Sequence, residues 1–196
     1  NTEKLLTEAQ DALSTPSNVY GMFINADLEF EDAIDKDGQA YPLTQGTFIK
    51  YLESDDRELR ASAFRNVYKA YGAHNNTLGA TLAGEVKKNV FNARTHHYRS
   101  ARERALSNNH IPEAVYDNLI KTVHKYLPLL HRYTKLRQEL LGLDDLKMYD
   151  LYTPLVKDVK FEMPYEEAKS WMLKALEPMG EEYLNVVKKG LDNRWV

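Results

Sequence analysis

The sequence predicts a mainly α-helical protein, with a long antiparallel helical hairpin, additional helices and one small β-hairpin near residues 28–44. Three observations carry this prediction. Apolar residues recur every three or four positions through two long stretches, 54–106 and 112–141, as they do in amphipathic helices. The first of these stretches contains no proline. Alternation of apolar and acidic residues, which is typical of strands, is confined to a short segment before them.

Short elements are expected before the long stretches. Residues 2–13 place leucines and alanines on one face and predict a helix, which the polar and proline-containing run 14–17 ends. Residues 19–24 are apolar without a clear period, so a short strand and a further turn both stay open. Residues 28–44 predict a β-hairpin around the turn sequence at 35–38, and an irregular acidic connector is the alternative. A short helix over 44–54 leads into the first long stretch.

The stretch from Ser54 to Leu106 predicts one helix, bent at residues 71–77, where glycine and asparagine are weak helix formers. Two helices in line are the alternative. Asp55 is expected to cap the N-terminus, with Glu58 three residues on completing a capping box.

A second long helix should open at Pro112, kink at Pro128 and end at Gly142. The connection to the first long helix is short, so the two should pack as an antiparallel pair. Residues 143–163 are irregular, with a possible strand over 157–161. Two short helices should follow, separated at Pro178, with Gly190 ending the last one.

Composition limits the classes of function. The 196 residues contain no cysteine, which excludes disulfides and thiolate zinc sites. The net charge of −3 gives no general attraction to nucleic acid or to an anionic membrane. No apolar run approaches the roughly 20 residues of a membrane span. The chain begins with Asn1 and ends on an amphipathic run, so we expect it to be cut from something longer.

Few residues suggest chemistry. None of the six histidines has the H-E-x-x-H spacing of a metallopeptidase helix. His110 is a candidate because it lies in the break between the two long helices. Tyr149 and Tyr152 lie in the irregular segment MYDLYTPL, and loop tyrosines of this kind often line binding sites. Core packing is the alternative for both tyrosines.

A basic run covers Lys87 to Arg104, with few acids between its members. The simplest interpretation is a solvated helix face with Arg–Glu pairs. A nucleic-acid surface and a positive wall facing a peptide carboxylate are the alternatives. On its residues alone, the chain is helical and has no self-contained active site.

Several stretches in order resemble oligoendopeptidase F, a family of thimet-type zinc metallopeptidases. They are LSTPSNVYGMFINADLEF (13–30), DDRELRASAFRNVYKAY (55–71), RSARERAL (99–106), NNHIPEAVYDNLI (108–120) and MYDLYTPL (148–155). The resemblance covers essentially the whole chain, although no single motif is catalytic. It implies that residues 1–35 end an N-terminal helical domain and that 36–196 open a peptidase domain that is incomplete here.

The resemblance also implies an activity for the complete protein. Such enzymes are cytoplasmic, and they use zinc held by an H-E-x-x-H helix and a downstream glutamate to hydrolyse short peptides inside a channel. This chain has none of those ligands, so we expect it to bind no zinc, to be inactive alone and to form channel wall, with the missing catalytic half as its partner. His110, Tyr149 and Tyr152 are the substrate-channel candidates. We expect no nucleic acid or membrane partner. A non-catalytic helical module that binds an acidic partner through Lys87–Arg104 is the alternative.

Overall fold

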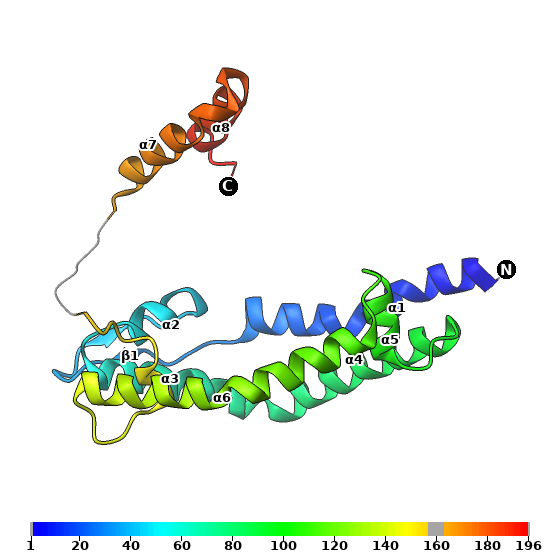
Figure 1. Ribbon diagram of the computed structural model, residues 1–196, viewed down its shortest axis with the longest axis horizontal. Coiled ribbons are helices and arrows are strands. Elements are labelled where there is room, and N and C mark those ends of the chain that lie inside the picture. The colour runs from blue at the N-terminus through cyan, green and yellow to red at the C-terminus, as the bar shows by residue number, and fades with distance from the viewer. Residues whose placement is uncertain (1, 157–162, 196) are drawn as a thin grey trace. The chain divides into compact units, whose positions relative to one another are not determined.

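The computed structural model describes residues 2–156 and 163–195 (Figure 1). These residues form eight α-helices and one two-stranded antiparallel sheet, so the prediction of a mainly α-helical fold is confirmed. The chain divides into two compact units, Asn1–Leu155 and Val156–Val196. The predicted strand over 157–161 lies outside the described residues. The domain boundary near residue 35, which the resemblance implies, stays a prediction.

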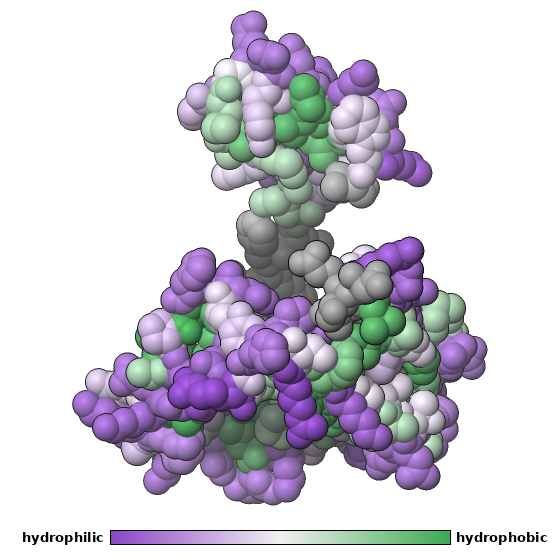
Figure 2. Space-filling view, turned by 90° about the vertical axis from the view of Figure 1, so that its right-hand side faces the viewer, coloured by the Kyte–Doolittle hydropathy of each residue, from purple (hydrophilic) through white to green (hydrophobic). Residues whose placement is uncertain are grey.

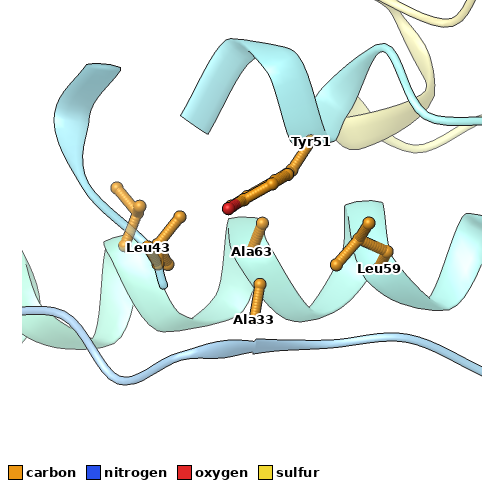
Figure 3. Close-up of a cluster of buried hydrophobic side chains, with 6 residues drawn as sticks. Ala33, Leu43, Tyr51, Leu59 and Ala63 are labelled. Atoms are coloured by element: carbon orange, nitrogen blue, oxygen red, sulfur yellow. The ribbon is translucent and has the colours of Figure 1, made fainter. Parts of the chain in front are cut away.

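The core of the larger unit lies between the predicted β-hairpin and two helices. Strands β1 (Ala33–Ile34) and β2 (Ala40–Tyr41) pair with Ala33 opposite Tyr41, and helices α2 (Gln45–Leu52) and α3 (Arg57–Ala73) pack beside them. Figure 3 shows side chains from these elements converging on the α3 face. The buried cluster consists of Ala33, Leu43, Tyr51, Leu59, Ala63 and Val67. The hairpin therefore supplies a hydrophobic cover for the first half of the long helical stretch.

The turn of the hairpin is closed by one carboxylate. Asp35 Oδ1 accepts the backbone N–H groups of Asp37 and Gln39 at 2.9 and 2.8 Å. Gly38 has a φ of 83°, a left-handed conformation that favours glycine. Both hairpin and turn follow the sequence prediction.

Helix α1 (Thr2–Met22) continues through the run 14–17 that was expected to end it, and this prediction was wrong. Pro16 lies inside the helix, and α1 packs against α4 there. A Cβ added at Gly84 of α4 would lie 2.7 Å from Pro16 Cγ, so glycine makes room for the proline ring. Packing thus compensates for the hydrogen bond that Pro16 removes. Residues 19–24 are helical rather than extended, because α1 passes into a π-helical turn, η1 (Phe23–Asp27).

The stretch 54–106 forms three helices rather than one. The prediction of a single bent helix was therefore wrong, and the alternative of two helices in line is closer to the structure. Helix α3 ends at Ala73, α4 spans Asn75–Thr95 and α5 spans Ala101–Ser107. His74 has φ −115° and ψ 20°, which interrupts the helix inside the predicted weak region. The second break contains His97, with a φ of 60°, and Ser100 then caps α5 by accepting the Glu103 N–H at 3.0 Å.

The N-cap of α3 is Asp56 rather than the expected Asp55. Asp56 Oδ1 accepts the N–H groups of Glu58 at 2.8 Å and Leu59 at 3.4 Å. Its pKa lies below the ordinary value: burial by itself raises it, but the hydrogen bonds from the backbone N–H groups of Lys36, Glu58 and Leu59 outweigh that effect.

Helix α6 (Glu113–Leu141) begins and ends where the sequence predicts, and the kink expected at Pro128 stays a prediction. Pro112 is its N-cap, Pro128 lies inside it, and Gly142 ends it in the left-handed conformation. Glu113 in its first turn accepts a hydrogen bond from Arg102 of α5. Near its end, Arg137 donates to the backbone of Asp150, whose side chain binds Arg60 at the start of α3. The helix therefore takes the predicted antiparallel course (Figure 1), yet Arg137 is its only buried side chain in the described part of the chain.

The smaller unit contains α7 (Tyr165–Ala175), the short 3-10 turn Glu177–Met179 and α8 (Glu181–Asp192). An ion pair between Lys169 and Asp192 joins the two helices. Gly190 lies inside α8, which ends at Asp192, so the prediction that Gly190 ends the last helix was wrong. The Trp195 ring packs over Gly190, where a Cβ would lie 3.3 Å from Trp195 Cε3.

Candidate functional site

A buried carboxylate organises the segment that contains the two candidate tyrosines. Asp150 belongs to a short 3-10 turn, η2 (Met148–Asp150), and its side chain has no exposed surface. A charge this deeply buried is rare unless it is paired. We refer to Asp150 and the three arginines that donate to it, Arg57, Arg60 and Arg137, as the Asp150 cluster.

Two arginines of α3 hold the Asp150 carboxylate. Arg60 Nη2 donates to Oδ1 at 2.8 Å, and Arg57 donates to both oxygens at 3.2 and 3.0 Å. They are three residues apart, which places them on one face of α3. The backbone N–H of Lys147 donates a further hydrogen bond to Oδ2 at 3.0 Å. Both carboxylate oxygens are therefore satisfied on the α3 side.

The third arginine comes from α6. Arg137 Nη2 donates to the backbone carbonyls of Asp150 at 3.3 Å and Thr153 at 2.6 Å. The segment is thus clamped between the start of α3 and the end of α6. Nε of Arg60, Nε of Arg137 and the Thr153 hydroxyl are buried without a hydrogen-bond partner among the described residues. The cluster carries more donors and more positive charge than its one carboxylate balances.

The pKa of Asp150 reflects this arrangement. Burial by itself raises the pKa of the carboxyl, but the hydrogen bonds from Arg57 and Arg60 outweigh it and hold the pKa below its ordinary value. Asp150 is therefore ionised at neutral pH. The ionised carboxylate holds the segment in place through its ion pairs, and it has no proton to donate.

The cluster sets the positions of the two tyrosines. The Tyr149 ring is half-buried, edge-on to Phe64 with ring centroids 5.9 Å apart, and the Arg57 guanidinium lies 5.5 Å from its centroid. Tyr152 is 52% exposed. The core-packing alternative therefore applies to much of the Tyr149 ring. About half of the Tyr152 surface is exposed and accessible to another molecule.

His110 lies in a different place. It has a φ of 54° in the connection between α5 and α6, and its side chain is exposed. It lines a surface pocket with Tyr98, Ser107 and the ion pairs of Arg99 with Glu103 and Glu113. Helix α6 separates His110 from the Asp150 cluster: 24 residues between Glu113 and Arg137 span about 36 Å at 1.5 Å per residue. The structure brings Tyr149 and Tyr152 into one segment and leaves His110 apart.

The basic run is neutralised within the chain at several positions. Arg102 pairs with Glu113 and Asp117 at 2.8 Å each, and Lys88 pairs with Glu85 at 2.6 Å. Arg99 pairs with Glu103 at 3.0 Å. The interpretation as a solvated face with Arg–Glu pairs is confirmed for these residues.

The described residues contain no group of three or more His, Cys, Asp or Glu side chains that could hold a metal ion. No helix in the described part of the chain is long and apolar enough to cross a membrane. Sequence reasoning missed the arginines of the Asp150 cluster. One signal was available, namely an aspartate in a tyrosine-rich segment, but Arg57 and Arg60 lie 93 and 90 residues upstream of it, and only folding brings them together.

Comparison with known proteins identifies the family. Residues 50–192 match Peptidase family M3. The chain is 55% identical over 194 residues to Oligopeptidase PepF of Bacillus subtilis, covering 99% of this chain and 29% of that protein. It is 44% identical over 196 residues to Group B oligopeptidase PepB of Streptococcus agalactiae, covering 100% of this chain and 32% of that protein.

A solved structure agrees in fold. The crystal structure of oligoendopeptidase-F from Enterococcus faecium superposes with a TM-score of 0.77 at 43% identity, covering 97% of this chain and 36% of that one. The chain spans about a third of the length of these relatives. The resemblance read from the sequence is confirmed: this chain belongs to peptidase family M3.

Proposed function

We propose that this chain is part of a zinc-dependent oligoendopeptidase of the cytoplasm that hydrolyses short peptides. The match of residues 50–192 to Peptidase family M3 carries the proposal. Relatives over nearly the whole chain bear the names oligopeptidase and oligoendopeptidase, which supports short peptides as the substrate class. In this proposal the chain is a wall of the substrate channel and not the catalytic centre.

The residues present do not fit a zinc site. The sequence lacks an H-E-x-x-H motif, and the described residues hold no group of metal-ligating side chains. Zinc and its ligands are therefore assigned to polypeptide outside these residues. The role left to this chain is to shape the channel and to hold substrate-contacting groups in position.

Tyr149 and Tyr152 are the channel residues in this proposal. Tyr152 is half-exposed, and the neighbouring Asp150 cluster fixes its backbone. A tyrosine on a fixed backbone offers an apolar ring and a hydroxyl to a peptide at low entropic cost. His110 belongs to the same proposal only if the channel extends along the length of α6.

The experiment compares the complete protein with the 196-residue chain. Hydrolysis of an internally quenched short peptide and metal analysis are measured on both. The proposal expects one zinc and activity in the complete protein, and neither in the chain alone, with or without added zinc. A complete protein that contains zinc but cleaves no peptide would refute the assigned activity.

The tyrosines are tested in the complete protein. Tyr152→Phe and Tyr149→Phe together should reduce peptide turnover, with thermal stability unchanged. Tyr183→Phe, an exposed tyrosine of α8, is the matched control. Unaltered turnover of the double variant would remove both residues from the substrate site.

The alternative function is a non-catalytic module that binds an acidic partner through Lys87–Arg104. The ion pairs of Arg99 and Arg102 within the chain count against it, because those charges are already engaged. Reversing both to glutamate would abolish partner binding under this alternative and leave peptide hydrolysis by the complete protein intact.

A further inference from the structure

Helix α5 is held in place by charged contacts rather than by a buried apolar face. None of its seven residues is buried in the described structure. Figure 2 looks onto the end of the larger unit that carries α5, and hydrophilic side chains predominate there. Helices shorter than about 12–15 residues are marginal in water on their own. Helix α5 therefore stays helical only while other parts of the chain hold it.

Ion pairs join α5 to the first turns of α6. Arg102 lies 2.8 Å from Glu113 and 2.8 Å from Asp117, and Arg99, just before α5, lies 3.3 Å from Glu113. The Arg102 guanidinium also lies 5.4 Å from the centroid of the Tyr116 ring. We refer to Arg99, Arg102, Glu113 and Asp117 as the α5 latch. The side chains of Arg99 and Arg102 are 80% and 44% exposed, so dissolved ions can reach the latch.

The chain turns at a left-handed residue on each side of α5. His97, between α4 and α5, has a φ of 60°, and His110, between α5 and α6, has a φ of 54°. This conformation is uncommon for a residue other than glycine. A change of φ at these two positions would swing α5 away from α6. The neighbouring helices would keep their places, because α4 packs against α1 and Arg137 of α6 binds the segment 150–153.

A surface pocket lies between α5 and the start of α6. Tyr98 and Ser107 line it on the α5 side, and His110 and Glu113 line it on the α6 side. Glu113 therefore belongs to both the pocket and the latch. Movement of α5 away from α6 would remove one wall of the pocket.

We propose that α5 is a lid on this pocket, closed by the ion pairs of the α5 latch and opened by rising ionic strength. The Debye length falls from about 10 Å at about 0.1 M salt to about 3 Å at about 1 M, so attraction between exposed charges weakens over this range. The buried Arg60–Asp150 pair is screened far less, so α3 provides an internal reference. The lid does not depend on the proposed peptidase function.

The test is amide hydrogen exchange of the complete protein at low and high salt, corrected for the intrinsic exchange rate of each residue. At about 0.1 M sodium chloride, the α5 amides should exchange about tenfold or more faster than those of α3, because α5 buries no side chain. At about 1 M, exchange of α5 should be about fivefold faster again, and that of α3 should change by less than about twofold. Exchange of α5 that is as slow as that of α3, or that does not respond to salt, would overturn the proposal.

Reversing one charge of the latch changes the sign of the salt effect. Arg102→Glu places a carboxylate beside Glu113 and Asp117, so α5 should exchange about fivefold or more faster at low salt. Added salt should then no longer accelerate exchange, because it screens a repulsion. Arg102→Gln should lie between the parent and Arg102→Glu. The same acceleration by salt in Arg102→Glu as in the parent would refute the latch.

Arg65→Glu is the matched control. Arg65 pairs with Glu58 on the surface of α3 at 3.8 Å, away from the latch, so its reversal should leave exchange of α5 unaltered. Unchanged exchange of the α3 amides reports that the Arg102 variants are folded. If Arg102→Glu fails this check, the salt dependence of the parent protein decides the proposal. Peptide hydrolysis measured on the same samples reports the proposed function separately, since amide exchange needs no activity.

Discussion

Replacing Asp150 by asparagine should destabilise the larger unit by about 3 kcal/mol. The Arg60–Asp150 pair is fully buried, with side chains 4% and 0% exposed and 2.8 Å between Nη2 and Oδ1. Removing one member of such a pair costs about 3–5 kcal/mol, because the other charge stays buried without compensation. Asparagine keeps the side-chain volume and one acceptor oxygen, so the lower end of this range of destabilisation applies. Arg57 is 42% exposed and adds less than about 1 kcal/mol.

The assay is urea unfolding of the 196-residue chain with two probes. Trp171 and Trp195, the only tryptophans, both belong to the smaller unit, so their fluorescence reports that unit. Most of the tyrosines belong to the larger unit, and their near-ultraviolet signal reports it. With a urea slope of about 2 kcal/mol per molar, the tyrosine transition should fall by about 1.5 M in the Asp150→Asn variant. The tryptophan transition should not move.

Asp145→Asn is the matched control. Asp145 pairs with Lys147 on the surface, where the two side chains are 65% and 52% exposed, so its loss should cost less than about 1 kcal/mol. A shift for Asp150→Asn no larger than the shift for Asp145→Asn would refute the assignment of the cluster as the clamp of the tyrosine segment.

The pH dependence provides an independent check. The pKa of Asp150 is lowered in the folded state, so its contribution to stability is fully present above the unfolded pKa of about 3.9 and is lost as the pH falls through the folded pKa. Asparagine does not titrate. The free energies of unfolding of the parent chain and the Asp150→Asn variant should therefore converge as the pH falls below about 3.9. A constant difference down to pH 2 would contradict this reasoning.

Four further substitutions test the α1–α4 packing, the α3 N-cap and a buried hydrogen bond. Gly84→Ala should destabilise the chain by about 1–3 kcal/mol, because the added Cβ would lie 2.7 Å from Pro16 Cγ. Gly79→Ala is its control: the added Cβ has nothing within 4 Å, so this change should stabilise α4 by up to about 1 kcal/mol. Thermal melts compare the two variants. Asp56→Ala should cost about 1 kcal/mol in urea titrations by removing the α3 N-cap, and this difference should shrink as the pH falls below about 3.9, because the folded pKa of the aspartate is lowered. Ser62→Ala should cost about 1–2 kcal/mol and speed amide exchange at β1, because the buried Ser62 hydroxyl accepts a β1 N–H at 2.9 Å.

Local signals predicted the elements whose boundaries depend on neighbouring residues. The hairpin turn at 35–38, the Pro112 start and the Gly142 end of α6 follow from residues that favour those backbone conformations on their own. Helical periodicity predicted the long stretch 54–106 but not its divisions. Ser100 and Glu103 form a capping signal inside it, and the continuous apolar period obscured that signal.

Errors arose where packing outweighs local preference. The run 14–17 contains proline and serines that usually end a helix, yet α1 continues because Gly84, 68 residues away, accommodates the Pro16 ring. No local property of 14–17 contains that information.

The sequence by itself determined the helical class, the β-hairpin, the long helix α6 and, through resemblance, membership of a peptidase family. It also marked the segment with Tyr149 and Tyr152 as a candidate site. Only the tertiary structure joined that segment to α3 and α6 through Asp150, and only it separated His110 by the length of α6. The physical reason is that periodicity and caps act within a few residues, whereas a buried charge can be satisfied by donors anywhere in the chain that folding brings within about 3 Å.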